Sequence, residues 1–186
     1  MKKLNLGSGK DIRRGWVNLD IVKSEGVNVV WNLERFPYPF KDSEFDLINC
    51  HMILEHLDDV QSVIKELWRI SKKGATIFIE VPHFSSWQAW GDITHKKAFN
   101  HSSLFPFSNK PQHRGSASLI NNQKEVFNIK PKIKMGKIKK SLGFERIFNL
   151  NNYARGFYER NLANIFPAES ILWELRVIKN ESKNKD

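Results

Sequence analysis

Short apolar segments that end in glycine or polar residues dominate the first 82 residues, and they restrict the chain to an α/β sheet. One amphipathic helix, from Val60 to Trp68, follows Asp58 or Asp59 as its N-cap and should end at Lys72-Lys73-Gly74. Strands joined by such crossovers predict a mostly parallel sheet. The β-branched run at Ala75–Val81 is typical of a strand covered on both faces. The predicted strands are Lys3–Leu6, Trp16–Ile21, Val27–Leu33, Phe45–Cys50 and Ala75–Val81.

The second half of the chain has a weaker pattern. Residues 84–125 are rich in His, Ser, Asn, Pro and aromatic side chains, and a span of this length is typical of functional or mobile segments. We expect one domain over residues 1–179 and a disordered tail over 180–186. The pattern predicts a half-exposed strand over Val126–Met135 interrupted by Pro131, a strand over Phe144–Leu150, a helical stripe from Tyr158 to Phe166, and a final strand over Ile171–Ile178.

The positive charge lies in the second half. Residues 1–100 carry 14 basic and 13 acidic side chains, a net of +1, whereas residues 101–186 carry 16 and 7, a net of +9. This half could meet an anionic partner, or its lysines could be a solvated surface. The chain has no apolar stretch of the roughly 20 residues that a membrane span needs, and Cys50 is its lone cysteine. We therefore expect a cytoplasmic protein without a membrane span.

A glycine turn and a carboxylate follow the first two predicted strands. Gly7-Ser8-Gly9 lets the backbone approach a ligand closely, although glycine pairs at strand ends are also common turns. Asp20 ends the second strand 11 residues after Gly9, where a carboxylate can accept both hydroxyls of a ribose. Ile12 stands where a dinucleotide fingerprint needs its third glycine, which argues against NAD and FAD. Because ligands gather at the carboxyl ends of such strands, we expect the chemistry there.

Several longer segments resemble one family. The chain is similar to class I S-adenosylmethionine-dependent methyltransferases, most closely the small type-11-like group. The resemblance implies a Rossmann-like methyltransferase fold with a mostly parallel central sheet and an antiparallel final strand, and S-adenosylmethionine as cofactor. The segments that carry it are Leu4–Gly9, Gly15–Asp20, Trp31–Glu34, Phe40–Asp46, His51–Leu57, Gly74–Pro82, Asp92–His95, Tyr158–Arg160 and Ile165–Glu169.

The resemblance also implies roles for residues at the strand ends. Gly7, Ser8 and Gly9 would wrap the methionine part of the cofactor, Asp20 would bind the ribose hydroxyls, and Ile21 would pack on the adenine. Asn32 and Leu33 fall where the family contacts the adenine edge, usually with an Asp, so Asn32 is a departure. His51 would face the methionine portion, or it could be a structural residue that caps the strand end.

The connections between the first strands are short. About six residues separate Gly9 from Trp16 and five separate Ile21 from Val27, whereas a parallel crossover helix needs a dozen or more. The first two helices of the usual fold must therefore be reduced to turns. One side of the cofactor site is thinly covered unless residues 84–125, an acceptor-site or lid segment, or a second subunit of a homodimer covers it.

Methyl transfer requires alignment and removal of a proton from the acceptor. His83, Asp92 and His95 are the candidate catalytic residues, although Asp92-Ile-Thr-His95 could also be a loop in which Asp92 accepts local hydrogen bonds. These residues could gather a metal together with His101, but their loose spacing matches no closed site, so we expect none. Cys50 lacks a catalytic context and receives no role.

We expect methyl transfer to an O or N acceptor, a small molecule or a glycan-type metabolite. The alternative is a basic nucleic-acid-binding module, or an RNA methyltransferase, on the same fold. Trp87, Trp90 and the phenylalanines of residues 84–125 would form a lid over the acceptor, stack on bases or fill the core. In the alternative, the lysines of Lys130–Lys140 would contact phosphates, whereas on a solvated strand they would discourage aggregation.

Overall fold

The computed structural model describes residues 1–109, 126–136 and 140–179, and these residues build one seven-stranded sheet. The strand order is β3-β2-β1-β4-β5-β7-β6. The strands are β1 (Lys3–Leu6), β2 (Val17–Asp20), β3 (Val29–Val30), β4 (Phe45–His51), β5 (Ser71–Pro82), β6 (Val126–Lys134) and β7 (Ser170–Ile178). The predicted α/β class is confirmed, although β3 has two residues where the sequence predicted seven.

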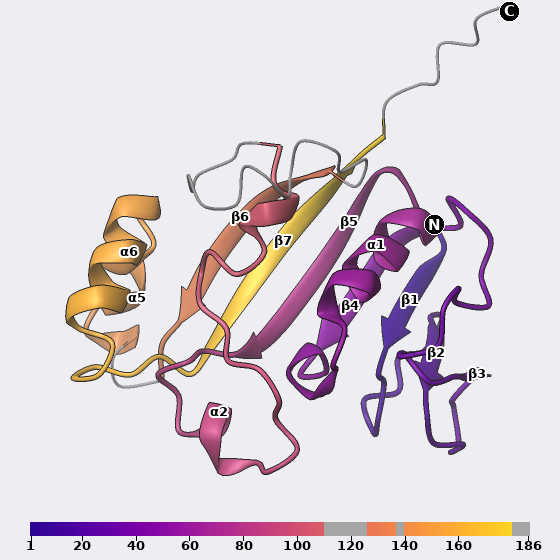
Figure 1. The fold of residues 1–186 in the computed structure, drawn as a ribbon, viewed down its shortest axis with the longest axis horizontal. Helices are drawn as coiled ribbons and strands as arrows, with labels where there is room; N and C mark the ends of the chain where they lie inside the picture. The colour runs from indigo at the N-terminus through magenta and orange to yellow at the C-terminus, as the bar shows by residue number, and fades with distance from the viewer. Residues whose placement is uncertain (110–125, 137–139, 180–186) are drawn as a thin grey trace, which may run out of the picture.

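The direction of the strands fixes where functional groups gather. Strands β1 to β5 run parallel to one another, and β7 lies antiparallel between β5 and β6. The predicted antiparallel final strand is thus confirmed. The carboxyl ends of β1, β2, β4 and β5 meet at one edge of the sheet, the lower edge in Figure 1.

Helix α1 (Val60–Ile70) covers one face of the sheet. The Asp59 side chain accepts a hydrogen bond from the Ser62 N–H as N-cap, and the helix buries Val63, Ile64 and Leu67. The predicted end at Lys72-Lys73-Gly74 is wrong, because the helix stops at Ile70. Residues from Ser71 onward pair with β4 instead, and Lys72 forms an ion pair with Asp46 at 2.9 Å.

The two short connections predicted between the first strands are turns, and this leaves the opposite face of the sheet partly open. The connections from β1 to β3 run across the sheet in one direction and the connection from β4 to β5 runs in the other, so right-handed crossovers place their helices on opposite faces. Because the first two crossover helices are missing, the face away from α1 is exposed. Strand β5 shows the result: Ala75, Ile77, Ile79 and Val81 are buried, whereas Thr76, Phe78 and Glu80 between them are only partly so. The expectation that both faces are covered is therefore wrong.

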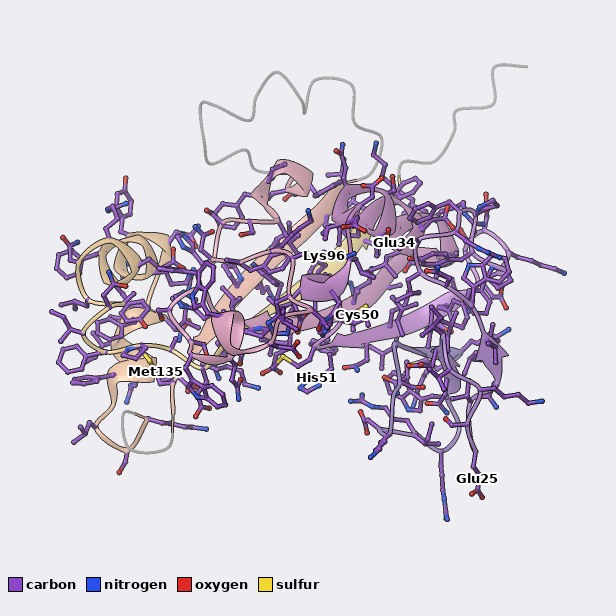
Figure 2. The ribbon with its side chains drawn as sticks, turned by 60° about the horizontal axis from the view of Figure 1, so that its bottom comes forward. Glu25, Glu34, Cys50, His51, Lys96 and Met135 are labelled. Atoms are coloured by element: carbon purple, nitrogen blue, oxygen red, sulfur yellow. The ribbon has the colours of Figure 1, made fainter. Side chains whose placement is uncertain are left out.

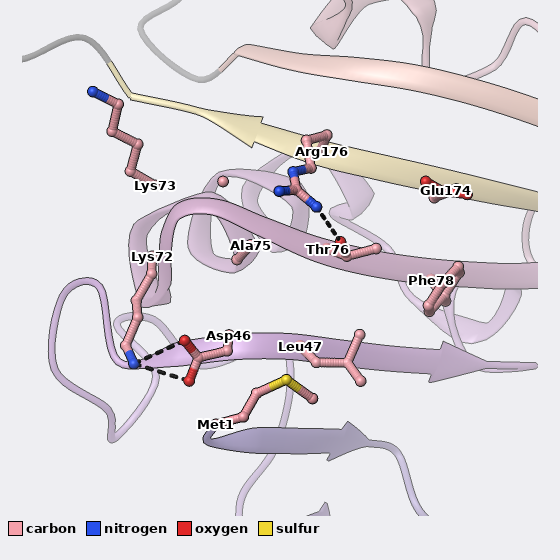
Figure 3. A pocket seen from close by; sticks show the side chains of 11 residues that line it. Met1, Asp46, Leu47, Lys72, Lys73, Ala75, Thr76, Phe78, Glu174 and Arg176 are labelled. Atoms are coloured by element: carbon pink, nitrogen blue, oxygen red, sulfur yellow. Dashed lines mark hydrogen bonds and ion pairs between the residues drawn. The ribbon is translucent and has the colours of Figure 1, made fainter.

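A cavity of about 500 Å³ lies on this open face near the amino ends of β4 and β5. Leu47, Thr76 and Phe78 line it, together with Glu174 and Arg176 of β7 (Figure 3). It is at the opposite end of the strands from the glycine turn. It is therefore separate from the predicted cofactor site.

Strand β6 forms the far edge of the sheet, and α5 and α6 lie beside it (Figure 1). Pro131 does not interrupt β6: it pairs with Trp173 of β7, since an edge strand tolerates a residue without N–H on its outer side. The predicted strand over Phe144–Leu150 is wrong, because Phe144–Phe148 forms the helix α5. The reason is Asn149, whose side chain accepts from the Ile133 N–H and donates to the Ile133 carbonyl, so it occupies that edge of β6.

Helix α6 (Asn152–Asn161) begins earlier than the predicted stripe. The Asn151 side chain caps it by accepting from the Ala154 N–H, and Tyr158 is its most buried apolar residue. The remainder of the stripe, from Leu162 to Phe166, lies beyond the helix.

The segment after β5 contains the short helices α2 (Gln88–Gly91) and η2 (Phe105–Phe107). The rest of the expected acceptor-site or lid segment, residues 110–125, lies outside the described residues, as does the tail 180–186. Within the part of the chain that the structure describes, no helix is long and apolar enough to cross a membrane.

Candidate active site

The glycine turn after β1 folds over the end of β2. The Ser8 N–H donates to the Leu19 carbonyl at 2.9 Å, and Gly7 and Gly9 have φ angles of +64° and +49°. A Cβ on Gly7 would lie 2.6 Å from the Cγ1 atom of Ile53, so the turn packs tightly there. A Cβ on Gly9 would meet no described atom within 4 Å. The turn therefore exposes its backbone to open space at Gly9.

The Asp20 carboxylate lies directly beside this space. Its Oδ2 accepts a hydrogen bond from the Gly9 N–H at 2.8 Å and its Oδ1 accepts from the Val22 N–H at 2.9 Å. Each carboxylate oxygen has two lone pairs, so one on each oxygen is left for a ligand hydroxyl. The buried Ser8 hydroxyl has no hydrogen-bond partner among the described residues, and it offers a further polar atom in the turn.

The residues predicted to hold an adenine lie after β2 and β3. Ile21 is 62% exposed, unusual for an apolar side chain in a folded domain, and Leu33 is buried. Asn32 accepts a hydrogen bond from the Glu34 N–H at its Oδ1, which leaves its amide nitrogen to donate. An amide nitrogen matches the ring acceptors of adenine, whereas the carboxylate that the family usually has matches the exocyclic amine.

His51 is the last residue of β4 and is exposed at the carboxyl edge of the sheet (Figure 2). It stands opposite Glu80 in the register of β4 and β5, close enough for its charge to contribute to the lowered pKa of that carboxyl. Burial, the largest influence on the pKa of Glu80, acts in the other direction, and hydrogen bonds from Lys134 and Ser170 outweigh it. Neighbouring Cys50 is buried, which raises its pKa and leaves the thiol protonated and unreactive.

Comparison with solved structures supports the fold. The chain is similar to an S-adenosylmethionine-dependent methyltransferase from Archaeoglobus fulgidus, with 17% identity and a TM-score of 0.60 over 95% of this chain and 85% of that one. It is similar to a methyltransferase in complex with the Haloferax volcanii Trm112 methyltransferase activator, with 13% identity and a TM-score of 0.56 over 96% and 82%. A third is a Haemonchus contortus phosphoethanolamine N-methyltransferase 2 with phosphomonomethylethanolamine and S-adenosylhomocysteine, with 13% identity and a TM-score of 0.54 over 97% and 50%.

Sequence comparison points in the same direction. No curated protein matches the chain significantly. Residues 11–79, from the end of the glycine turn to the middle of β5, match the family model Methyltransf_11, a methyltransferase domain. Over these residues the chain is similar to a methyltransferase domain, and its fold is that of S-adenosylmethionine-dependent methyltransferases. The open space at Gly9, the remaining lone pairs of Asp20 and the exposed Ile21 fit S-adenosylmethionine as the cofactor.

After β5, His83 is part of a buried network. Its side chain is 0% exposed, and its Nδ1 accepts from the Ser85 N–H at 3.3 Å. Because an N–H can only donate, Nε2 carries the ring proton and donates to Glu159 Oε1 at 3.1 Å. Both ring nitrogens are thus engaged in hydrogen bonds within the described residues, and the catalytic role of His83 stays a prediction.

Glu159 of α6 is at the centre of this network. Its Oε2 lies 2.6 Å from His101 Nδ1, and its Oε1 accepts from the His101 N–H at 2.8 Å. Burial alone would raise the pKa of Glu159, but the hydrogen bonds from His101 and His83 outweigh it and lower the pKa to about 2. The carboxylate therefore stays charged and ties α6 to the segment after β5. The sequence did not predict this role for Glu159.

Asp92 and His95 lie in one loop after α2. Asp92 Oδ1 accepts from the Thr94 N–H at 2.8 Å and from the Thr94 hydroxyl at 2.6 Å, so the local hydrogen bonds of the alternative interpretation are present. Asp92 Oδ2 is 3.9 Å from His95 Nε2. The four residues considered together for a metal are separated: His83 and His101 bind Glu159, whereas His95 packs against His56 with ring centroids 4.7 Å apart.

Glu55 was not predicted from the sequence. It lies in η1 (Leu54–His56), directly after β4, and is 1% exposed. Burial raises the pKa of Glu55 to about 7. Its position beside His56 in the segment His51–Leu57 was visible, but only the fold brings His95 next to this pair, 39 residues later in the chain.

A cavity of about 370 Å³ opens beside α2. Trp87 and Trp90 line this cavity and are 78% and 71% exposed. Ser85, Ala168 and Glu169 also line it. Two exposed tryptophans beside a cavity form an apolar surface with polar neighbours, which suits a ligand that is flat and polar at its rim.

The lysines of β6 are paired with acidic side chains. Lys134 lies 2.7 Å from Glu80, Lys132 lies 3.2 Å from Glu145, and Lys130 lies 3.9 Å from Glu174. Residues 137–139, which hold two more lysines of the predicted phosphate-binding stretch, lie outside the described residues. The positive charge of β6 is therefore largely compensated within the protein.

Proposed function

We propose that the chain is a methyltransferase that binds S-adenosylmethionine at the carboxyl edge of β1, β2 and β4 and methylates an O or N atom of a small molecule or a glycan-type metabolite. The observation that carries the proposal is the hydrogen bond of 2.8 Å between the Gly9 N–H and Asp20, beside open space, in a chain with a methyltransferase-domain match. When bound, the cofactor supplies an activated methyl group on a sulfonium.

The residues of the chain would bind and orient the cofactor. Gly7, Ser8 and Gly9 would surround the methionine part, with His51 at its edge, and the two remaining lone pairs of Asp20 would accept the ribose hydroxyls. Ile21, Asn32 and Leu33 would contact the adenine. The exposed apolar surface of Ile21 supports this assignment, because an adenine ring would cover it.

The acceptor would be activated by the Asp92 and His95 loop. The His95 imidazole can accept the proton of the acceptor group, and the neighbouring Asp92 carboxylate can stabilise the imidazolium that forms. The cavity beside Trp87 and Trp90 supports a small acceptor, since its volume of about 370 Å³ suits a small molecule and flat rings can stack on its tryptophans. His83 would act by holding this region together.

Calorimetric titration with S-adenosylmethionine, and separately with S-adenosylhomocysteine, tests the cofactor assignment. Asp20→Ala should weaken binding by about 1.5–3 kcal/mol, or roughly 10–150-fold, because the ribose hydroxyls lose a charged acceptor. The affinity of Asp20→Asn for the cofactor should lie between those of wild type and Asp20→Ala, because Asn keeps one acceptor oxygen. Asp42→Ala is the matched control, an exposed carboxylate near the amino end of β4. Equal affinity for wild type and Asp20→Ala would contradict the assignment.

The tryptophans provide a test of the acceptor pocket. After acceptors are screened with a labelled methyl group, Trp87→Ala should raise KM by roughly fivefold, corresponding to about 1 kcal/mol of lost ring stacking. Cofactor affinity should not change. Tyr153→Ala, an equally exposed aromatic residue on α6, serves as control. An unchanged KM in Trp87→Ala would place the acceptor elsewhere.

The nucleic-acid alternative gains no support from the ion pairs of Lys130, Lys132 and Lys134. A steep fall of oligonucleotide affinity with salt would revive it, since each phosphate contact contributes a slope of roughly 0.9 on duplex DNA. The expected homodimer and the cytoplasmic location stay predictions.

A further inference from the structure

The strongest unassigned feature is a cluster of Glu55, His56 and His95. One ligand atom from each of these three side chains lies within 4.8 Å of the others. Two segments build it: η1 and the loop that contains Asp92. The Lys96 N–H donates to the Glu55 carbonyl at 2.8 Å, and Lys96 also forms an ion pair with Asp58 at 2.6 Å. The loop is thereby fixed against η1.

Glu55 is the first indication of a ligand. Both of its carboxylate oxygens are buried and have no hydrogen-bond partner among the described residues. A carboxylate in such a place costs several kcal/mol unless a proton or a cation compensates its charge. Nearby Lys96 does not do so, because its ammonium group is paired with Asp58 at the surface.

His56 is oriented with a lone pair left for a ligand. The single proton of the Thr94 hydroxyl goes to Asp92 Oδ1, at 2.6 Å. The Thr94 oxygen can therefore only accept from His56 Nδ1, which lies 2.9 Å away. Nδ1 thus carries the ring proton, and Nε2 is left unprotonated in the neutral ring.

His95 has the same arrangement. Its Nδ1 faces the Ala89 carbonyl at 3.4 Å, and a carbonyl can only accept, so Nδ1 holds the proton and Nε2 keeps its lone pair. Histidines that bind metals typically donate the N–H of the distal ring nitrogen to a carbonyl or hydroxyl oxygen, which fixes the tautomer and the ring orientation. Two histidines of this kind beside a buried carboxylate without a partner can together bind a metal ion.

We propose that Glu55, His56 and His95 bind one divalent transition-metal cation. One carboxylate and two imidazoles suit Zn²⁺, Fe²⁺, Co²⁺ or Mn²⁺ rather than Ca²⁺ or Mg²⁺, which prefer oxygen ligands. Asp92 Oδ2, 3.9 Å from His95 Nε2 and half exposed, is within reach as a fourth ligand or as the partner of a bound water. Asp92 is half exposed, so water can reach the cluster from its side.

The location gives the cation a place in the proposed reaction. Ile53, directly before η1, packs against Gly7, so the cluster adjoins the glycine turn. On the basis of the proposed function, a cation here would lie on the acceptor side and lower the pKa of an acceptor hydroxyl. His95 would then act on the acceptor as a metal ligand instead of as a free base.

Cation binding can be measured without any cofactor or acceptor. Whole, tag-free protein is treated with a chelator, dialysed, and titrated with Co²⁺ by visible absorption and with Zn²⁺ by calorimetry. We expect one equivalent of Co²⁺ with a ligand-field spectrum of nitrogen and oxygen ligands, and a rise in Tm. His56→Gln and His95→Gln should each weaken Zn²⁺ binding more than about 100-fold, and Thr94→Val, which removes the hydroxyl that orients His56, by about 10–100-fold.

The control is His51→Gln, which removes an exposed histidine at the same sheet edge and should leave Zn²⁺ affinity unchanged. Glu55→Gln keeps the shape of the buried side chain and should abolish stoichiometric binding. Circular dichroism shows whether the Glu55→Gln variant folds. If it does not fold, the proposal is tested by His56→Gln and His95→Gln. Absence of Co²⁺ binding by folded wild type, or equal Zn²⁺ binding by wild type and His56→Gln, overturns the proposal. Failure to bind S-adenosylmethionine would contradict the proposed function and leave this site standing.

Discussion

Glu159→Ala is expected to lower Tm by about 10 °C. The change removes the acceptor of two ring N–H groups and one backbone N–H from His83 and His101. A hydrogen bond to a charged group contributes about 1.5–3 kcal/mol, so the loss of these bonds should cost at least about 3 kcal/mol, and 1 kcal/mol shifts Tm by roughly 2–4 °C at this size. Thermal unfolding followed by circular dichroism measures it.

The pH dependence of this effect has a definite sign. The pKa of Glu159 is lowered from its ordinary 4.5 to about 2 in the folded protein. The stabilisation is therefore complete above about pH 4.5 and is lost as the pH falls toward 2. The difference in Tm between wild type and Glu159→Ala should shrink over that window and stay constant from pH 5 to 7. Glu25→Ala, at an exposed turn, is the control, and a similar loss of Tm in both variants would refute the argument.

Sequence reasoning predicted the turns that follow β1 and β2 better than the contacts of the segments that follow β5. Gly9 follows β1 and Asp20 ends β2, and these two strands are parallel neighbours in the sheet. Their carboxyl ends therefore lie side by side, which brings Gly9 and Asp20 within hydrogen-bond distance. The short connections after Gly9 and Ile21 likewise required turns, because a crossover helix does not fit in them. Local periodicity and chain length are enough for this half of the fold.

The errors concern contacts between segments that are distant in sequence. Nothing in the pattern of Phe144–Leu150 shows that Asn149 occupies the edge of β6, and this contact excludes a strand there. The sequence does not show that Glu159, 76 residues after His83, engages its ring. It also does not show that Glu55 is buried. In each case a single side-chain hydrogen bond or a single buried carboxyl group decides the local structure. Neither feature produces a periodic pattern in the sequence.

The largest expected effect on catalysis is that of His95→Gln, which should lower kcat by about 10²–10⁴-fold with little change in cofactor affinity, since His95 lies on the acceptor loop and Asp20 on the cofactor side. The measurement is steady-state turnover with the acceptor from the labelled-methyl screen, alongside calorimetry with S-adenosylmethionine. Lys97→Ala, an exposed neighbour two residues along, is the matched control. Equal losses in kcat and in cofactor affinity would make His95 a structural residue.

The two roles open to His95 differ in what else changes. If His95 is a free base, a chelator should have no effect on wild-type kcat. If His95 is a metal ligand, chelation should abolish wild-type turnover and added Zn²⁺ or Mn²⁺ should restore it, whereas His95→Gln should respond to neither. In both roles His95 acts through Nε2, which keeps its lone pair because Nδ1 donates its proton to the Ala89 carbonyl.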